Sequence, residues 1–321
     1  MSVYFSDLDH AVFFTLSYSD YFNFPLTKKE IHQRLAKVWD WRFLIGQKLT
    51  TSKLMLKRDK ALLQKSLESL EKKEKIASLA KGKTVYYFLK GRQDLVGLRS
   101  SKKTMAKNRQ SAINQASNYL QRFPSIKAVF LTGSSALNNA DLDDDLDFCL
   151  IVKKNTLWIS RFFVILLAKI LGKQPQIDAQ AKNNNKQAWC LNLWLDESSL
   201  NIVNRGFSIY QAYELKQMRS LFDRDNLKEK ILLNNKQFAE LLALGPENEP
   251  NLGSKNKIFD YCLWLVNVFF YALQNIYRYL LFGKEDYFIN LQQAHFNQFD
   301  RQEKIFKDIK NKMKANAFSD F

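Results

Sequence analysis

The chain has 321 residues, of which 46% are hydrophobic and 14% aromatic, and its formal net charge is +17. This composition excludes a fibrous or largely disordered chain and provides apolar surface for two or three domains. The first 124 residues hold 24 basic against 10 acidic residues, a net of +14, while the remainder nets +3. A basic first third predicts contact with a polyanion such as nucleic acid, although a solvated lysine-rich surface gives the same count.

The cysteines and the long apolar segments indicate in which cellular compartment the chain is expected. Three cysteines, an odd number without CxxC spacing, predict reduced thiols in a cytoplasmic protein rather than a disulfide framework. The amino terminus has no basic segment before its first apolar run, so no secretory signal is expected. Residues 156–172 and 259–282 are apolar but interrupted by polar residues, which predicts buried or partner-facing helices and no integral membrane segment. The second of them is also a candidate for contact with a membrane surface.

Residues 1–97 have the pattern of a winged helix-turn-helix. An apolar helix over about 7–18 is followed by a turn and by the capping box Thr27–Glu30, which opens a second helix. A third helix is predicted over about 57–73, and a β-hairpin around Gly82 provides the wing. Basic residues surround the third helix, where such proteins meet nucleic acid, so this segment is a candidate nucleic-acid interface; they are Lys48, Lys53, Lys57, Arg58, Lys60 and Lys65.

The rest of the chain divides into three further parts. A polar connector helix is predicted over 98–124. Residues 125–208 alternate short apolar strands (128–131, 146–152 and 189–195) with an apolar helix and polar loops, which predicts an α+β domain built on a small mixed sheet flanked by helices. Residues 209–321 follow a helical pattern and are predicted to form a C-terminal helical region.

A glycine-serine turn and a pair of acids stand on either side of the loop between the first two of these strands. Gly133, followed by Ser134 and Ser135, forms a turn where backbone amides can approach a triphosphate without obstruction by a side chain. Asp145 and Asp147 are separated by one apolar residue at the start of a strand, so both carboxylates point to the same face. Two such neighbours repel each other unless a cation lies between them, and Mg²⁺ prefers hard oxygen ligands.

Five acids crowd this loop, and the strand register selects two of them. Asp145 and Asp147 alternate with the apolar residues of the strand, whereas Asp141 and Asp143, which have the same spacing, lead into more loop and are expected to be solvated or to support the site. The Gly-Ser turn alone and the Asp-x-Asp pair alone are weak signals. Their combination, ten residues apart and on a buried strand, predicts a site for a nucleoside triphosphate (NTP) and up to two Mg²⁺ ions.

Gly133-Ser134 with Asp145-Leu146-Asp147-Phe148 resembles the signature of the DNA polymerase β-like nucleotidyltransferase superfamily, and the surrounding segments are similar to uncharacterised bacterial proteins with that domain after a winged helix. The resemblance implies Mg²⁺ dependence and transfer of a nucleoside monophosphate from an NTP to an acceptor hydroxyl. The superfamily places a third carboxylate on a later strand, where this chain has Asn192. An amide can bind a metal but cannot serve as a base, and Asp178, Asp196 and Glu197 are alternative sources of the acid.

The expected function is therefore a Mg²⁺-dependent nucleotidyltransferase with an unidentified acceptor. The alternative is a non-catalytic, nucleotide-sensing protein that binds nucleic acid or regulates a partner through its winged helix. Two other residues are less informative. Arg161 in the apolar helix reaches either a phosphate or a local partner. His295 is expected to serve only in packing.

Overall fold

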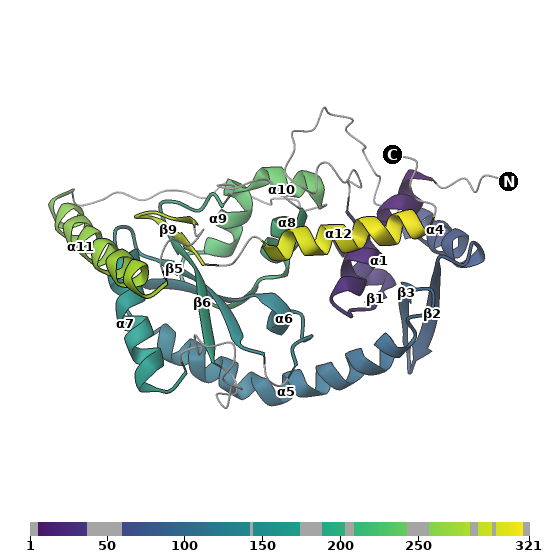
Figure 1. Ribbon diagram of the computed structural model, residues 1–321, viewed down its shortest axis with the longest axis horizontal. Coiled ribbons are helices and arrows are strands. Elements are labelled where there is room, and N and C mark those ends of the chain that lie inside the picture. Colours follow the sequence, from purple (N-terminus) through teal and green to yellow (C-terminus); the bar gives the residue numbers. More distant parts are fainter. Residues whose placement is uncertain are drawn as a thin grey trace.

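The computed structural model describes residues 6–36, 60–141, 144–173, 188–202, 209–242, 257–282, 288–296 and 300–316. The chain is an α+β protein with two separate sheets joined by one long helix (Figure 1). The basic positions 48, 53, 57 and 58, and the loop positions 143 and 178, lie outside the described residues.

The amino-terminal part combines helices with a three-stranded sheet of order β1-β3-β2. The Thr27–Glu30 capping box is confirmed: the Thr27 amide donates to Glu30 Oε2 at 2.8 Å, and the Glu30 amide donates to Thr27 Oγ1 at 3.2 Å. The predicted hairpin is also present, and Gly82 at its turn has a φ of +60°. The elements are α1 (Asp7–Tyr21), β1 (Leu26–Thr27), α2 (Lys28–Arg34), α4 (Lys60–Lys72), β2 (Ile76–Lys81) and β3 (Thr84–Leu89).

Helix α5 (Asp94–Leu120) connects the two sheets and runs along one edge of the molecule (Figure 1). It begins four residues earlier than the predicted connector of residues 98–124. Near its start, Arg99 forms an ion pair with Glu30 and stacks on Phe24, with 4.1 Å between the guanidinium carbon and the ring centroid. Further along, Arg109 reaches the loop before β5. The helix therefore ties the amino-terminal part to the acidic loop of the second sheet.

The second sheet has six strands in the order β7-β4-β5-β6-β9-β8. The central strands β4, β5 and β6 correspond to the three predicted strands; β4 and β5 are antiparallel, whereas β5 and β6 are parallel. One helix, α6, fills the turn after β4. The strands and this helix are β4 (Ile126–Leu131), α6 (Gly133–Ala136), β5 (Leu146–Val152), β6 (Trp189–Asp196), β7 (Arg219–Asp223), β8 (Phe288–Ile289) and β9 (Gln293–His295).

The prediction of a purely helical region over 209–321 is wrong, because β7, β8 and β9 come from this segment and complete both edges of the sheet. These strands have five residues or fewer, too few to show a period of two, and the edge of an existing sheet is what orders them. The helices around the sheet are α7 (Leu157–Ile170), α8 (Ile209–Gln217), α9 (Leu227–Asn234), α10 (Lys236–Leu241), α11 (Lys257–Phe282) and α12 (Asp300–Ala315).

Both faces of the central strands are buried, which explains their nearly continuous apolar sequence. Phe148 and Leu150 of β5 point to the face covered by α5 and α7. Cys149 and Ile151 point to the opposite face, where α8, α9 and α12 join the core of the amino-terminal helices. Asp147 has the parity of Cys149 and therefore faces α8. No helix among the described residues is long and apolar enough to cross a membrane.

Candidate functional site

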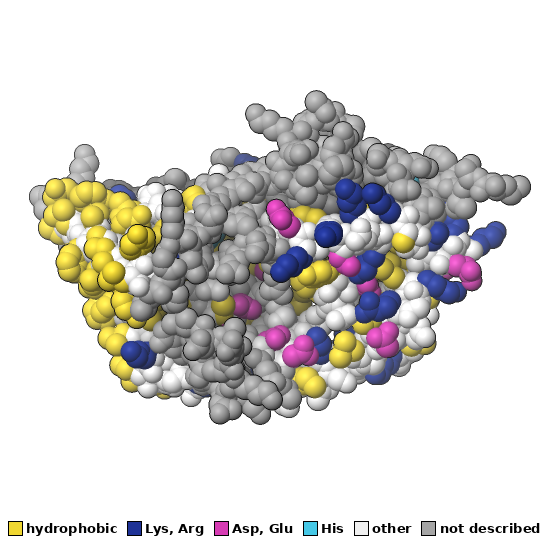
Figure 2. Space-filling view, viewed as in Figure 1, with side chains coloured by type: hydrophobic (Ala, Val, Ile, Leu, Met, Phe, Trp, Pro, Cys, Tyr) yellow, Lys and Arg dark blue, Asp and Glu magenta, His cyan; other side chains and the backbone are white. Residues whose placement is uncertain are grey.

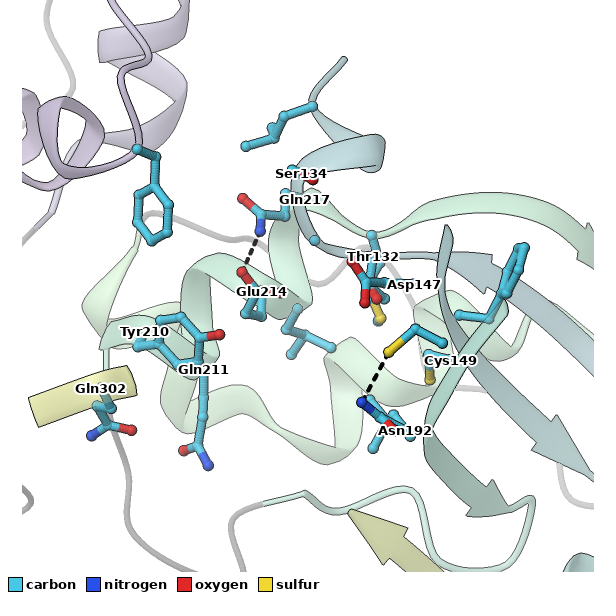
Figure 3. Close-up of a pocket in the computed structure, with 18 of the residues that line it drawn as sticks. Thr132, Ser134, Asp147, Cys149, Asn192, Tyr210, Gln211, Glu214, Gln217 and Gln302 are labelled. Atoms are coloured by element: carbon cyan, nitrogen blue, oxygen red, sulfur yellow. Dashed lines mark hydrogen bonds between the residues drawn. The ribbon is translucent and has the colours of Figure 1, made fainter. Parts of the chain in front are cut away.

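A cavity of about 710 Å³ lies between this second face of the sheet and the helices α1, α8 and α12. Its volume is in the range of small-molecule sites. Both predicted acids, Asp145 and Asp147, line it together with Gly133, Ser134 and Asn192. Residues on α8 face them across the cavity; Figure 3 shows Tyr210, Gln211, Glu214 and Gln217 on that side.

The turn after β4 lies directly against the acidic strand. The Thr132 amide donates to the carbonyl oxygen of Asp147 at 2.9 Å, which fixes the end of β4 beside the start of β5. Gly133 has a φ of +61°, and a Cβ added to it would collide with Oδ2 of Asp147 and lie 3.1 Å from its Cγ. Only glycine allows both this backbone conformation and this approach. The two parts of the predicted signature are therefore in contact.

The two serines after Gly133 have different positions. Ser134 lines the cavity, and its hydroxyl donates to Oδ2 of Asp144 at 3.0 Å. Ser135 is buried away from the cavity lining, and its hydroxyl has no hydrogen-bond partner among the described residues. Its predicted role is thus limited to its backbone amide, which lies in the first turn of α6, where helix amides have no acceptor within the helix.

The acids of the loop are held from behind by basic residues of α5, which the sequence analysis did not identify. The side chain of Arg109 is 1% exposed and donates to the backbone carbonyls of Asp141, Asp144 (2.6 Å) and Asp145 (3.0 Å). The buried ammonium of Lys102 donates to Oδ2 of Asp141 at 3.2 Å. Burial lowers the pKa of Arg109, and the neighbouring aspartates oppose that shift. The residues that make these contacts are some 35 positions apart in the sequence, so no local sequence pattern reveals the contacts.

The carboxyl group of Asp145 has one oxygen atom whose hydrogen-bonding capacity is not satisfied. Its Oδ1 is buried without a hydrogen-bond partner among the described residues. Partial burial raises the pKa of Asp145, and the negative charge of Asp144 raises it further, while Arg109 opposes both. A buried carboxylate oxygen without a donor is costly unless a cation or a proton occupies it.

The strand on which the resemblance predicts a third carboxylate presents a thiol and an amide beside Asp147, from Cys190 and Asn192. In the parallel register of β5 and β6, Cys190 lies opposite Asp147. Its thiol hydrogen-bonds to Asp147 and accepts a bond of 2.9 Å from the Nδ2 of Asn192 (Figure 3). Burial, and then the charge of Asp147, raise the pKa of Cys190, so the thiol stays protonated. Neither side chain can accept a proton from a substrate at neutral pH.

The alternative acids on β6 lie at its other end. Asp196 is opposite Val152, five positions along β5 from Asp147, or roughly 17 Å at the usual strand rise. Its carboxylate accepts from the amides of Asn155 and Ser198, and Glu197 accepts from the amide of Lys154. Neither lines the cavity. Of the described residues that do line it, Glu214 on α8 is the one acid besides those of residues 144–147, and it accepts a hydrogen bond from Gln217.

The structure also shows the surroundings of His295 and Arg161. His295 lines the cavity from β9, its Nε2 has no hydrogen-bond partner among the described residues, and burial lowers its pKa to about 4. It is therefore a neutral imidazole at the cavity wall rather than only a packing residue. Arg161 donates to Gln274 on α11 at 2.6 Å and does not line the cavity, so its local-partner interpretation fits the structure.

No group of three or more His, Cys, Asp or Glu side chains among the described residues is arranged to hold a metal ion by itself. No family model, curated protein or solved structure matches the chain. The assignment of function therefore depends on the chemistry of this cavity.

Proposed function

We propose that this chain is a Mg²⁺-dependent nucleotidyltransferase of the DNA polymerase β-like type. In this reaction the oxygen of an acceptor hydroxyl bonds to the α-phosphorus of an NTP and pyrophosphate leaves. The observation that carries the proposal is the contact between the Gly133 turn and the Asp147 carboxylate. That contact brings a turn without side-chain obstruction and a pair of carboxylates into one cavity large enough for a nucleotide.

The residues present fit a magnesium ion that is completed by its substrate. Asp145 and Asp147 would hold it, since Mg²⁺ is usually bound by one or two carboxylates plus waters and phosphate oxygens. The buried Oδ1 of Asp145, which lacks a partner among the described residues, supports this assignment. When bound, the ion neutralises phosphate charge and makes the acceptor hydroxyl more acidic.

The remaining roles follow from the geometry of the cavity. The amides of the Gly133 turn and the Ser134 hydroxyl bind phosphate oxygens, and Arg109 keeps the acidic loop in place from behind. Glu214 takes the proton of the acceptor hydroxyl, because Cys190 and Asn192 cannot. The acceptor hydroxyl then lies between α8 and the sheet, on the side of the cavity that the amino-terminal helix α1 closes.

A second candidate function is nucleotide sensing without transfer. The observation that favours it is the protonated thiol and the amide on the strand where a third carboxylate is predicted. In this version residues 1–97 form a winged helix that contacts nucleic acid or a regulatory partner, and bound nucleotide controls that contact through the shared cavity wall.

Calorimetric titration of the four NTPs into the full chain, with and without Mg²⁺, tests the site. We expect saturable, Mg²⁺-dependent binding of at least one NTP, and an affinity at least about 100-fold weaker in the Asp145→Asn/Asp147→Asn variant, since both metal ligands lose their charge. The matched control is Glu74→Gln/Asp94→Asn, which removes two negative charges from exposed acids outside the cavity.

Two results of this titration would contradict the proposal. One is equal affinity in the wild type and the double variant, and the other is no binding by folded wild type. If an NTP binds, Mg²⁺-dependent release of pyrophosphate in the presence of RNA, protein or small hydroxyl acceptors separates the enzyme from the sensor.

A further inference from the structure

Helix α11 has an unusual distribution of side chains: many large apolar groups face outward, while two buried amides lie with Phe270 and Tyr271 on the side that packs against the protein. Its buried Asn267 accepts from the Trp158 amide of α7 at 2.7 Å, and its buried Gln274 donates to the Trp158 carbonyl at 2.7 Å. These two amides fix the rotation of α11 on α7. A helix at the surface of a water-soluble domain normally has the opposite arrangement.

The outward face forms a patch that we call the aromatic ridge. Of the seventeen exposed large hydrophobic side chains among the described residues, thirteen belong to α11 or α7. Figure 2 shows hydrophobic side chains gathered at the end of the molecule where Figure 1 places these two helices. The ridge consists of Phe163, Leu166, Ile170, Tyr261, Trp264, Leu265, Val266, Phe269, Leu273, Ile276, Tyr277, Tyr279 and Leu280.

The ridge is larger than an apolar patch that a monomer normally leaves in water. An aromatic side chain covers about 150–250 Å² when fully buried, so thirteen large side chains at about half exposure present on the order of 1,000 Å². The largest patch on a typical monomeric protein is about 300–600 Å². Such an area indicates that something covers it.

The charges on the two helices of the ridge are mainly positive. Helices α7 and α11 contain four bases, Arg161, Lys169, Lys257 and Arg278, and one acid, Asp260 in the first turn of α11, which gives a net charge of +3. The guanidinium carbons of Arg161 and Arg278 lie 4.2 and 4.6 Å from the centroid of one ring, that of Phe296. Lys169 is exposed beside Ile170. Burial lowers the pKa of Arg161 to about 9, and the one other charged group that shifts it is the cation Arg278.

We propose that the aromatic ridge binds the surface of a membrane that contains anionic lipids, with α11 lying flat on the bilayer. Trp264, Tyr261, Tyr277 and Tyr279 have the amphipathic rings that favour the boundary between headgroups and acyl chains. Lys169, which is exposed at the end of α7, is placed for a lipid phosphate or carboxylate. This inference is independent of the proposed nucleotide site, because no residue of the ridge lines that cavity.

A second copy of the chain fits the ridge less well. Symmetric pairing would bring the same face of both copies together, so two helix pairs that each have a net charge of +3 would meet. Like charges in such an interface oppose association. A bilayer, in contrast, supplies the anions that the ridge lacks.

Cosedimentation of the full chain with vesicles tests the proposal. We expect binding to vesicles of phosphatidylcholine and phosphatidylserine at about 3:1, and at least fivefold weaker binding to phosphatidylcholine alone, because each basic residue near an anionic surface contributes about 1 kcal/mol. In Phe269→Asp/Ile276→Asp the partition coefficient is expected to fall at least about tenfold, since each side chain would be withdrawn from the apolar layer. Both positions are about 60% exposed, so the variant retains its fold, which thermal unfolding verifies.

The matched control is Leu79→Asp/Val85→Asp on the β2–β3 hairpin, where the side chains are 45% and 43% exposed. It adds the same negative charge at the other sheet and is expected to bind vesicles within about twofold of wild type. Wild type that fails to bind, a ridge variant that binds like wild type, or equal binding to neutral vesicles would overturn the proposal. A dimer in lipid-free sedimentation velocity that only the ridge variant loses, without vesicle binding by wild type, would identify a second copy as the occupant instead.

Discussion

The acids at the two ends of the β5–β6 strand pair differ in how their carboxylates are hydrogen-bonded. At one end, Asp196 is fully buried, and its two oxygens accept from the Asn155 amide (2.7 Å) and from the amide and hydroxyl of Ser198 (2.8 and 2.6 Å). At the other end, Asp145 has a buried oxygen without a partner among the described residues. Burial is the main cause of the raised pKa in both.

The difference lies in the donors around each carboxylate and not in burial itself. Protein groups satisfy Asp196, so its role is to hold the turn after β6. Asp145 lies at the edge of a cavity and beside a glycine turn, and its Oδ1 has no partner among the described residues. A perturbed pKa thus indicates a candidate functional site when the residue also lines a cavity and has an unsatisfied atom. Substitutions of the acids in and near the cavity, and of Asp196, test this difference.

The largest effect is expected at Glu214, the acid that faces the cavity from α8. In Glu214→Gln we expect nucleotidyl transfer to fall about 100-fold or more, because a positioned general base contributes about 10²–10⁴ in rate. NTP affinity, measured by the same calorimetric titration, is expected to stay within about threefold of wild type, since Glu214 does not hold the metal. Equal loss of binding and transfer would instead assign Glu214 to nucleotide binding.

A loss of stability without a loss of binding is expected at the other end of the strand pair. Asp196→Asn replaces an acceptor oxygen by an amide donor that faces an existing N–H group. It is expected to cost about 2–3 kcal/mol in the free energy of unfolding, measured in denaturant. NTP affinity of the folded protein should not change. A selective loss of NTP binding would show that the two ends are not separate.

The smallest effect concerns the stability of the nucleotide-free protein. The folded-state pKa of Asp145 is raised above its ordinary value of 3.8, so the ionised carboxylate destabilises the folded state at pH values above the folded-state pKa. Asp145→Asn is therefore expected to raise the Tm at pH 7 by up to about 2 °C without ligand.

This gain has a defined dependence on pH and ligand. It should shrink as the pH falls through the raised folded-state pKa and vanish below 3.8, where the carboxyl is protonated in both states. Addition of Mg²⁺ and the bound NTP should reverse the order of the two Tm values, because only wild type gains binding energy. An Asn variant less stable than wild type at pH 7 without ligand would place Asp145 with Asp196 as a structural acid.

The sequence predicted the local elements well where a period or a cap was present. The capping box of α2, the hairpin at Gly82 and the strands β4, β5 and β6 have local causes, namely hydrogen bonds three residues apart, a left-handed glycine and continuous burial. The strands β7 and β9 were missed because pairing with β4 and β6, and not their own composition, orders them.

The sequence alone identified most groups of the candidate site: a glycine followed by Ser134, and two carboxylates on one face of a strand. Those follow from residue type and from a period of two. The tertiary structure decided which other groups stand beside them. In the folded chain Arg109, Cys190 and Glu214 lie around the acids, whereas Asp196 pairs with Val152 at the opposite end of the strand pair. The outward face of α11 is apolar. These outcomes depend on strand register and helix rotation, which long-range packing fixes and no local pattern records.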